Sequence, residues 1–167
     1  MGSIIIGYPG VGKSTLAGNN NYIDLESSMF RNSLGEKIED WDCAYVSVAE
    51  DLARQGYNVF ISSHSDVYNH FSYNVVKSLQ SLDDINVLAV YPSSRVFNVW
   101  VDKLGSRYRN DPSTKNLAAY TRAQNHIVSD IEELKDFAKR NSITTVEIDS
   151  LDYSLSSMII SALRDQQ

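Results

Sequence analysis

The residues most able to do chemistry lie near the start of the chain, in the segment Gly7-Tyr8-Pro9-Gly10-Val11-Gly12-Lys13-Ser14. This segment fits the Walker A pattern, a glycine-rich loop that follows a strand and opens a helix. In such a loop backbone N–H groups surround a β-phosphate, the lysine reaches the β- and γ-phosphates, and the serine hydroxyl ligates Mg²⁺. The sequence therefore predicts a phosphate site made by Gly7, Pro9, Gly10, Val11, Gly12, Lys13, Ser14 and Thr15.

Asp24 lies at the carboxyl end of the second apolar run of the chain, and Arg31 follows a few residues later. Open α/β sheets bind ligands at the carboxyl ends of their strands, so we expect Asp24 to face the γ-phosphate. There it would hold Mg²⁺ through water or accept the proton of an attacking hydroxyl, whereas a structural Asp24 would cap the turn into residues 26–28. Arg31 would bind an acceptor phosphate or carboxylate, or else remain a solvated surface arginine.

His64 closes the Ser62-Ser63-His64 segment that follows the third apolar run. At a strand end the imidazole would contact a substrate phosphate; the alternative is an ordinary turn histidine bonded to the backbone. Many P-loop enzymes place a Mg²⁺-holding Walker B aspartate here, and this chain has serines instead. His70 and His126 have no neighbouring metal-binding pattern and are assigned no chemistry.

Cations gather around a predicted helix break at residues 110–113. Arg107 and Arg109 end one predicted helix, and Lys115 begins the next. Arginines in this position would clamp donor phosphates, neutralise the charge that develops during transfer and exclude water as a lid closes. The alternative is a helix C-terminus that favours positive side chains through its dipole. We expect the other basic helix residues, Arg122 among them, to lie on solvated helix faces.

Short apolar runs alternate with helical spacing along the chain, which indicates an α/β fold. Predicted strands cover residues 3–6, 22–25, 58–62, 86–91 and 143–148. Predicted helices cover residues 13–18, 40–55, 66–82, 94–107, 114–140 and 154–163. Strands that alternate with helices favour a doubly wound parallel sheet with right-handed crossovers.

Size and composition limit the class of protein. The 167 residues fit a single domain, residues 1–167, and 43% hydrophobic residues suffice for a substantial core. The net charge of −6 gives no general attraction for nucleic acid or an anionic membrane. Without a leader pattern or a membrane-length apolar run, a soluble cytoplasmic protein is expected. Cys43, the single cysteine, is expected to be a small buried residue in a reducing compartment.

Several segments together resemble the P-loop nucleoside and nucleotide kinases, the group that contains adenylate, shikimate and gluconate kinase. The chain looks most similar to small nucleotide kinase-like proteins of bacteriophages, for which the location would be the host cytoplasm. The similar segments are residues 7–15, 22–28, 60–64, 90–92, 100–109 and 115–116. Walker A is the specific motif among them, and the others contribute through their order and spacing.

The resemblance implies a three-layer α/β/α P-loop fold with a five-stranded parallel sheet in the order 2-3-1-4-5. It also implies ATP as phosphoryl donor, Mg²⁺, and a small mobile helical lid around residues 104–118. The acceptor implied first is a nucleoside monophosphate or its deoxy form. A hydroxylated metabolite, a polynucleotide 5′-hydroxyl, or a non-catalytic ATP-binding regulatory module are the alternatives.

The chain also departs from the family pattern. It has no Asp-Gly-Phe-Pro-Arg segment after the third strand and no zinc-binding lid cysteines. The stretch between the second strand and Asp40 is too short for a full domain that binds nucleoside monophosphates. The acceptor therefore stays open at this point, as does the oligomeric state.

Overall fold

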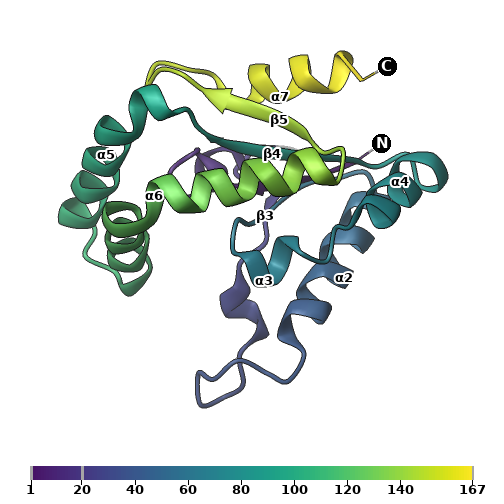
Figure 1. Cartoon of the computed structure of the whole chain (residues 1–167). Helices are drawn as coiled ribbons and strands as arrows, with labels where there is room; N and C mark the ends of the chain where they lie inside the picture. Colours follow the sequence, from purple (N-terminus) through teal and green to yellow (C-terminus); the bar gives the residue numbers. More distant parts are fainter. Residues whose placement is uncertain (1, 20, 167) are drawn as a thin grey trace.

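A computed structural model describes residues 2–19 and 21–166 and is built on one five-stranded parallel sheet (Figure 1). The strands are β1 (Ser3–Gly7), β2 (Tyr22–Asp24), β3 (Asn58–Ser62), β4 (Asn86–Pro92) and β5 (Thr144–Ile148). Their order is β2-β3-β1-β4-β5, and every neighbouring pair is parallel. The predicted α/β/α fold and strand order are therefore confirmed.

The middle residues of the three central strands are continuously apolar because helices cover both faces of the sheet. Ile5 of β1 pairs with Phe60 of β3 on one side and with Leu88 of β4 on the other. All three side chains are fully buried. This central position of β1 places the loop that follows it at the middle of the carboxyl edge of the sheet.

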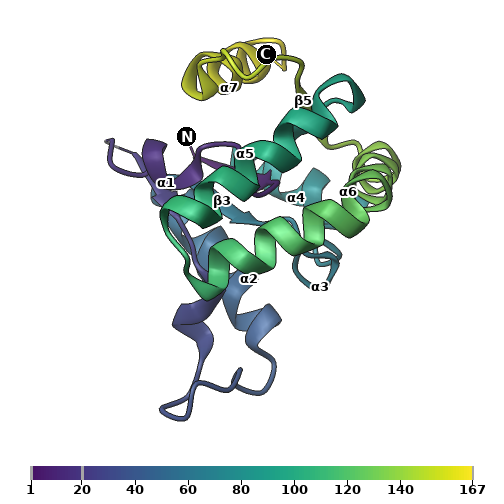
Figure 2. The ribbon, with the colours of Figure 1, turned by 90° about the vertical axis from the view of Figure 1, so that its left-hand side faces the viewer.

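Seven α-helices and two short 3₁₀ helices complete the described residues. The α-helices are α1 (Lys13–Leu16), α2 (Trp41–Arg54), α3 (Ser65–Tyr68), α4 (Tyr73–Leu82), α5 (Phe97–Asn110), α6 (Thr114–Arg140) and α7 (Leu155–Arg164), and the 3₁₀ helices are η1 (Ser27–Phe30) and η2 (Ser94–Val96). Figure 2 shows α1 and α7 on one side of the sheet and α2, α3 and α6 on the other. Right-handed crossovers account for the sides taken by the connecting helices, since the chain moves one way across the sheet after β1 and the opposite way after β2, β3 and β4. Helix α7 follows the last strand, β5, and is not part of a crossover.

The single helix predicted over residues 66–82 is wrong, because the structure has two helices there, α3 and α4. The break contains Phe71, which is fully buried. A buried residue in a turn adds to an apolar pattern just as a helical residue does, so the periodicity did not reveal the break. At the start of α3 the Nδ1 atom of His64 accepts a hydrogen bond from the backbone N–H of Asp66 at 3.3 Å.

Helix α6 is continuous but strongly bent. Its first half is seen from the side in Figure 2 and end-on in Figure 1, and its second half shows the reverse. Arg122 and Asp130 form an ion pair across the bend. In a straight helix eight residues rise about 12 Å, so this contact lies on the inner side of the bend. The first half of α6 contacts α5, where Tyr120 stacks on Tyr108, and the second half contacts β4 and β5, where Lys135 lies over Tyr91 and pairs with Glu147.

The structure bears on two expectations drawn from composition, the first on membrane spans and the second on Cys43. Across residues 2–19 and 21–166, no helix combines the length and apolar character needed to cross a membrane. Cys43 is exposed on α2, so the prediction that it is buried is wrong. It lies in the first turn of the helix, whereas the buried side of α2 is made by Tyr45, Val46, Ala49 and Ala53.

Candidate active site

The Walker A segment forms a tight loop between β1 and α1. Gly10 and Gly12 have φ angles of +91° and +106°, a conformation that other L-residues rarely adopt. A Cβ atom on Gly10 would also lie 3.0 Å from Leu104 Cδ2 and 3.1 Å from Trp100 Nε1. Gly10 is therefore needed both for its backbone conformation and for the close approach of α5.

The outer side of this loop is fixed by side chains from distant elements. Three loop carbonyls accept hydrogen bonds: Pro9 from Trp100 Nε1 at 2.9 Å, Gly10 from Lys103 Nζ at 2.7 Å, and Val11 from the Tyr153 hydroxyl at 2.8 Å. In a trans peptide a carbonyl and the N–H of the following residue point in opposite directions. The N–H groups of Gly10 and Gly12, which follow the Pro9 and Val11 carbonyls, therefore face the inner side of the loop. Among the described residues, neither amide has a protein acceptor. The inner side thus offers free N–H donors to an anion.

Lys13 lies at the start of α1, and its ammonium donates to the Gly7 carbonyl at 2.9 Å. The pKa of Lys13 is lowered to about 8, mainly by burial. The negative charge of Asp24 opposes this shift, whereas the positive charges of Lys115 and Arg107 contribute to it. Negatively charged phosphate oxygens in the loop would stabilise the protonated form of Lys13.

Asp24 is partly buried at the carboxyl end of β2. Burial raises its pKa above the usual value, and the charges of Lys13, Lys115 and Arg107 act in the opposite direction. Lys115 itself forms an ion pair with Glu26, which lies two residues after Asp24. The structure therefore brings together four residues predicted from the sequence: Lys13, Asp24, Arg107 and Lys115.

The edge that carries Asp24 is supported by a buried phenol. Tyr45, from α2, donates its hydroxyl hydrogen to the Leu25 carbonyl and accepts from the Ser62 N–H at 3.0 Å. The Leu25 N–H in turn donates to the Phe60 carbonyl at 3.0 Å. These bonds join the ends of β2 and β3, and they fix the backbone on which Asp24 is placed.

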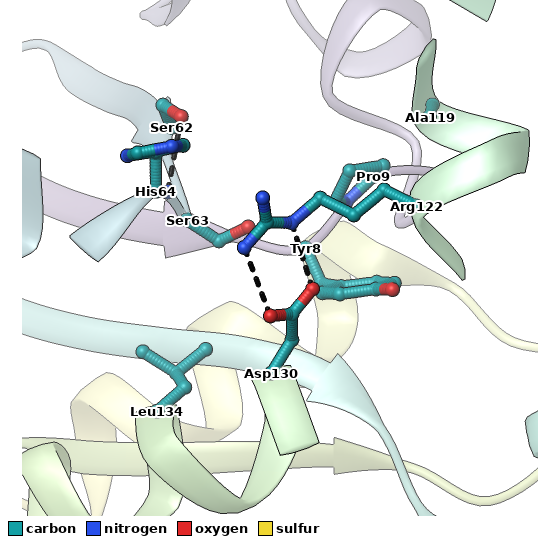
Figure 3. A pocket seen from close by; sticks show the side chains of 9 residues that line it. All are labelled: Tyr8, Pro9, Ser62, Ser63, His64, Ala119, Arg122, Asp130 and Leu134. Carbon is teal, nitrogen blue, oxygen red and sulfur yellow. Dashed lines mark hydrogen bonds and ion pairs between the residues drawn. The ribbon is translucent and has the colours of Figure 1, made fainter. Parts of the chain in front are cut away.

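A pocket of about 100 Å³ lies beside the start of the loop, between the end of β3 and the bend of α6 (Figure 3). It is lined by Tyr8, Pro9, Ser62, Ser63, His64, Ala119, Arg122, Asp130 and Leu134. Arg122 donates from Nε and Nη2 to the Asp130 carboxylate at 2.8 Å and 2.9 Å. Three of the five guanidinium N–H donors remain for other partners. Tyr8 and Pro9 belong to the Walker A segment, called the P-loop below, so the pocket directly adjoins the predicted phosphate site.

His64 lines this pocket, and its Nδ1 accepts a hydrogen bond from the Asp66 N–H at the start of α3, which is the bond expected of an ordinary turn histidine. Contact between His64 and a substrate phosphate stays a prediction. Arg122 was expected on a solvated helix face, and its side chain is 51% exposed to solvent. The bend of α6 also brings it to the wall of the pocket, which was not expected. Asp130 was not identified from the sequence at all. A spacing of eight residues falls outside the usual three- and four-residue pairs of a helix, so only the bend could have revealed the two together.

Two other predicted residues are not brought to this site. Arg31 is exposed and donates to the Gly35 carbonyl at 2.6 Å, within its own loop. Arg109 is exposed and donates to Ser106 Oγ at 3.0 Å, within α5. By contrast, the tip of the α5–α6 hairpin is well held, because the buried Asn116 amide donates to the Asp111 carbonyl at 2.8 Å.

A scan against protein-family models and a search of the curated proteins found no match for this chain. Its function is therefore inferred from its own residues and their geometry.

Proposed function

We propose that the protein is a P-loop phosphotransferase that moves the γ-phosphoryl group of ATP to an acceptor bound in the Arg122–His64 pocket. One observation carries the proposal: the same glycine-rich loop adjoins two groups of functional residues. Free amides, Lys13 and Asp24 belong to the phosphate side, and the pocket opens beside Tyr8 and Pro9. Such an arrangement would hold a phosphoryl donor and an acceptor next to each other at the same loop.

The donor side fits a nucleotide with its metal ion. Ser14 offers an exposed hydroxyl in the first turn of α1, and Asp24 offers a carboxylate. These are the hard oxygen donors that Mg²⁺ prefers. When bound, Mg²⁺ would neutralise charge on the β- and γ-phosphates. Lys13 and Arg107 would stabilise the negative charge of the transferring group.

The acceptor side fits an anionic group. Within residues 2–19 and 21–166 the Arg122 guanidinium donates to Asp130 alone, which leaves three of its five N–H donors for a ligand. Ser63 and His64 add polar atoms to the lining of the same pocket. A volume of about 100 Å³ suits a phosphate-sized group better than a whole nucleoside. A nucleoside monophosphate that inserts its phosphate here is therefore our first choice of acceptor.

Asp24 allows a second class of acceptor. A phosphate oxygen attacks without losing a proton, whereas a hydroxyl acceptor needs a base to accept one. Burial raises the pKa of Asp24, which makes its carboxylate a stronger base. This observation favours a hydroxylated metabolite or a polynucleotide 5′-hydroxyl as the alternative acceptor.

The test is ADP release from ATP and Mg²⁺ with a panel of nucleoside monophosphates, nucleosides and 5′-hydroxyl oligonucleotides. We expect ADP formation to depend on one acceptor class and to fall at least tenfold in Lys13→Met. Lys139→Met removes an exposed lysine from the far end of α6 and is the matched control. Saturable ATP binding without any acceptor-dependent ADP would contradict the proposal and support a regulatory module.

A further inference from the structure

A second group of side chains, with atoms that can ligate a metal ion, lies away from the glycine-rich loop. Asp42 and Cys43 belong to the first turn of α2, and His70 belongs to the turn between α3 and α4. Their ligand atoms all lie within 4.8 Å of one another. In the described part of the chain, no other group of three His, Cys, Asp or Glu residues meets this condition.

The backbones that carry these side chains are held by the core. Next to His70, Phe71 is fully buried and its N–H donates to the Tyr68 carbonyl at 2.9 Å. The His70 N–H donates to the Val67 carbonyl at 3.3 Å. On the other element, Tyr45 is fully buried two residues after Cys43. The three side chains are therefore presented by rigid segments, which lowers the cost of binding a common ligand.

The distances are close to those of a tetrahedral metal site. Zinc binds imidazole nitrogen and carboxylate oxygen at about 2.0–2.1 Å and thiolate at about 2.3 Å, so neighbouring ligand atoms lie roughly 3.3–3.6 Å apart. His70 Nε2 and Asp42 Oδ2 are 3.1 Å apart. The cysteine sulfur needs a shift of about 1 Å or less, which a side-chain rotation supplies at an exposed position.

We propose that Asp42, Cys43 and His70 form a zinc-binding site with one coordination position left for water. A nitrogen and a sulfur donor beside one carboxylate favour zinc over magnesium or calcium, which take oxygen ligands. Thiolate and carboxylate together match the charge of the ion. The bound metal joins the start of α2 to the α3–α4 turn, and this role is independent of nucleotide.

The competing explanation is a simple ion pair between His70 and Asp42 beside an unrelated free thiol. Both explanations predict contact between the imidazole and the carboxylate. Only the zinc site requires the sulfur atom to join them, so the test must follow Cys43.

The first experiment titrates the purified full chain with Co²⁺, a spectroscopic substitute for zinc. We expect a thiolate-to-cobalt charge-transfer band that saturates at one ion per chain and disappears on addition of Zn²⁺. Cys43→Ser should abolish the band, and His70→Gln should weaken Co²⁺ binding at least tenfold. His126→Gln, a substitution of an exposed histidine on α6, should change neither. Absence of the band in the unsubstituted chain would overturn the proposal.

A second measurement needs no variant. Cys43 is the only cysteine, so alkylation of the intact chain reports on one thiol. Zn²⁺ should slow this alkylation at least tenfold, and a chelator should restore the rate. An unchanged rate at saturating Zn²⁺ would contradict the site whatever the outcome of the ADP-release test.

Discussion

The guanidinium of Arg122 and the carboxylate of Asp130 meet through two hydrogen bonds across the bend of α6. Arg122 lies on the half of the helix that contacts α5, and Asp130 lies on the half that contacts the sheet. The same pair lines the pocket beside the P-loop. A ligand that binds the Arg122 guanidinium therefore also affects the Arg122–Asp130 ion pair, which spans the bend.

Arg122→Met should weaken acceptor use. Loss of the guanidinium removes the main cation of the pocket, and a charge-assisted contact to an anion is worth about 1.5–3 kcal/mol. We expect the KM for the acceptor to rise at least tenfold while the Kd for ATP stays within twofold. Steady-state kinetics and isothermal titration calorimetry measure the two quantities.

The matched control for this prediction is Arg140→Met, at the exposed end of the same helix. Its kinetic constants should stay at the level of the unsubstituted protein. If Arg122→Met left the acceptor KM unchanged, the pocket would not be the acceptor site.

Trp100→Phe should weaken the support that α5 gives to the glycine-rich loop. The substitution retains an aromatic ring in a fully buried position but removes the N–H that bonds the Pro9 carbonyl at 2.9 Å. Loss of a buried hydrogen bond costs about 1–3 kcal/mol. Urea unfolding should show a decrease of this size together with weaker ATP binding. Normal stability and normal ATP affinity would mean that the loop needs no support from α5.

Asp24→Asn separates catalysis from binding. The amide preserves the shape of the side chain but cannot act as a base and is a poorer metal ligand. We expect turnover to fall at least tenfold with a smaller change in the Kd for ATP. Thermal unfolding is the control, because a purely structural Asp24 would lower the melting temperature and leave turnover per folded molecule intact.

Lys13 should make ATP binding depend on pH. Its lowered pKa of about 8 means that the free protein loses this ammonium charge as the pH rises through 8. Phosphate raises the pKa again, so binding at about pH 9 should take up a proton and binding at about pH 6.5 should take up none at this residue. Affinity should fall correspondingly above pH 8.

Calorimetry in buffers of different ionisation enthalpy measures this proton uptake. Lys13→Met should eliminate the uptake at high pH, and Lys139→Met should leave it unchanged. Equal proton uptake by the unsubstituted chain and Lys13→Met would assign the proton to another group.

Local patterns predicted the sheet and the tight glycine-rich loop that follows β1. Central parallel strands are continuously apolar, and the P-loop is a contiguous motif, so both can be read from neighbouring residues. The pocket could not be predicted in this way. Arg122 reaches it through a bend in α6, and its partner Asp130 is two helical turns away.

The zinc-ligand group shows the same limit. Its residues come from two segments whose relative position depends on how the predicted 66–82 helix breaks at Phe71. Cys43 was expected to be buried because cysteine usually is. Its actual exposure follows from its phase on α2, which the core fixes through Tyr45 and Val46.

The bond between Trp100 and Pro9 gives the protein an internal optical reporter. The indole is fully buried, its N–H is bonded to the P-loop, and its ring stacks on Tyr153 with centroids 6.3 Å apart. The other tryptophan, Trp41, lies on α2 under the ammonium of Lys37. In a Trp41→Phe background, emission comes from Trp100 alone and follows the polarity around the loop without any attached dye.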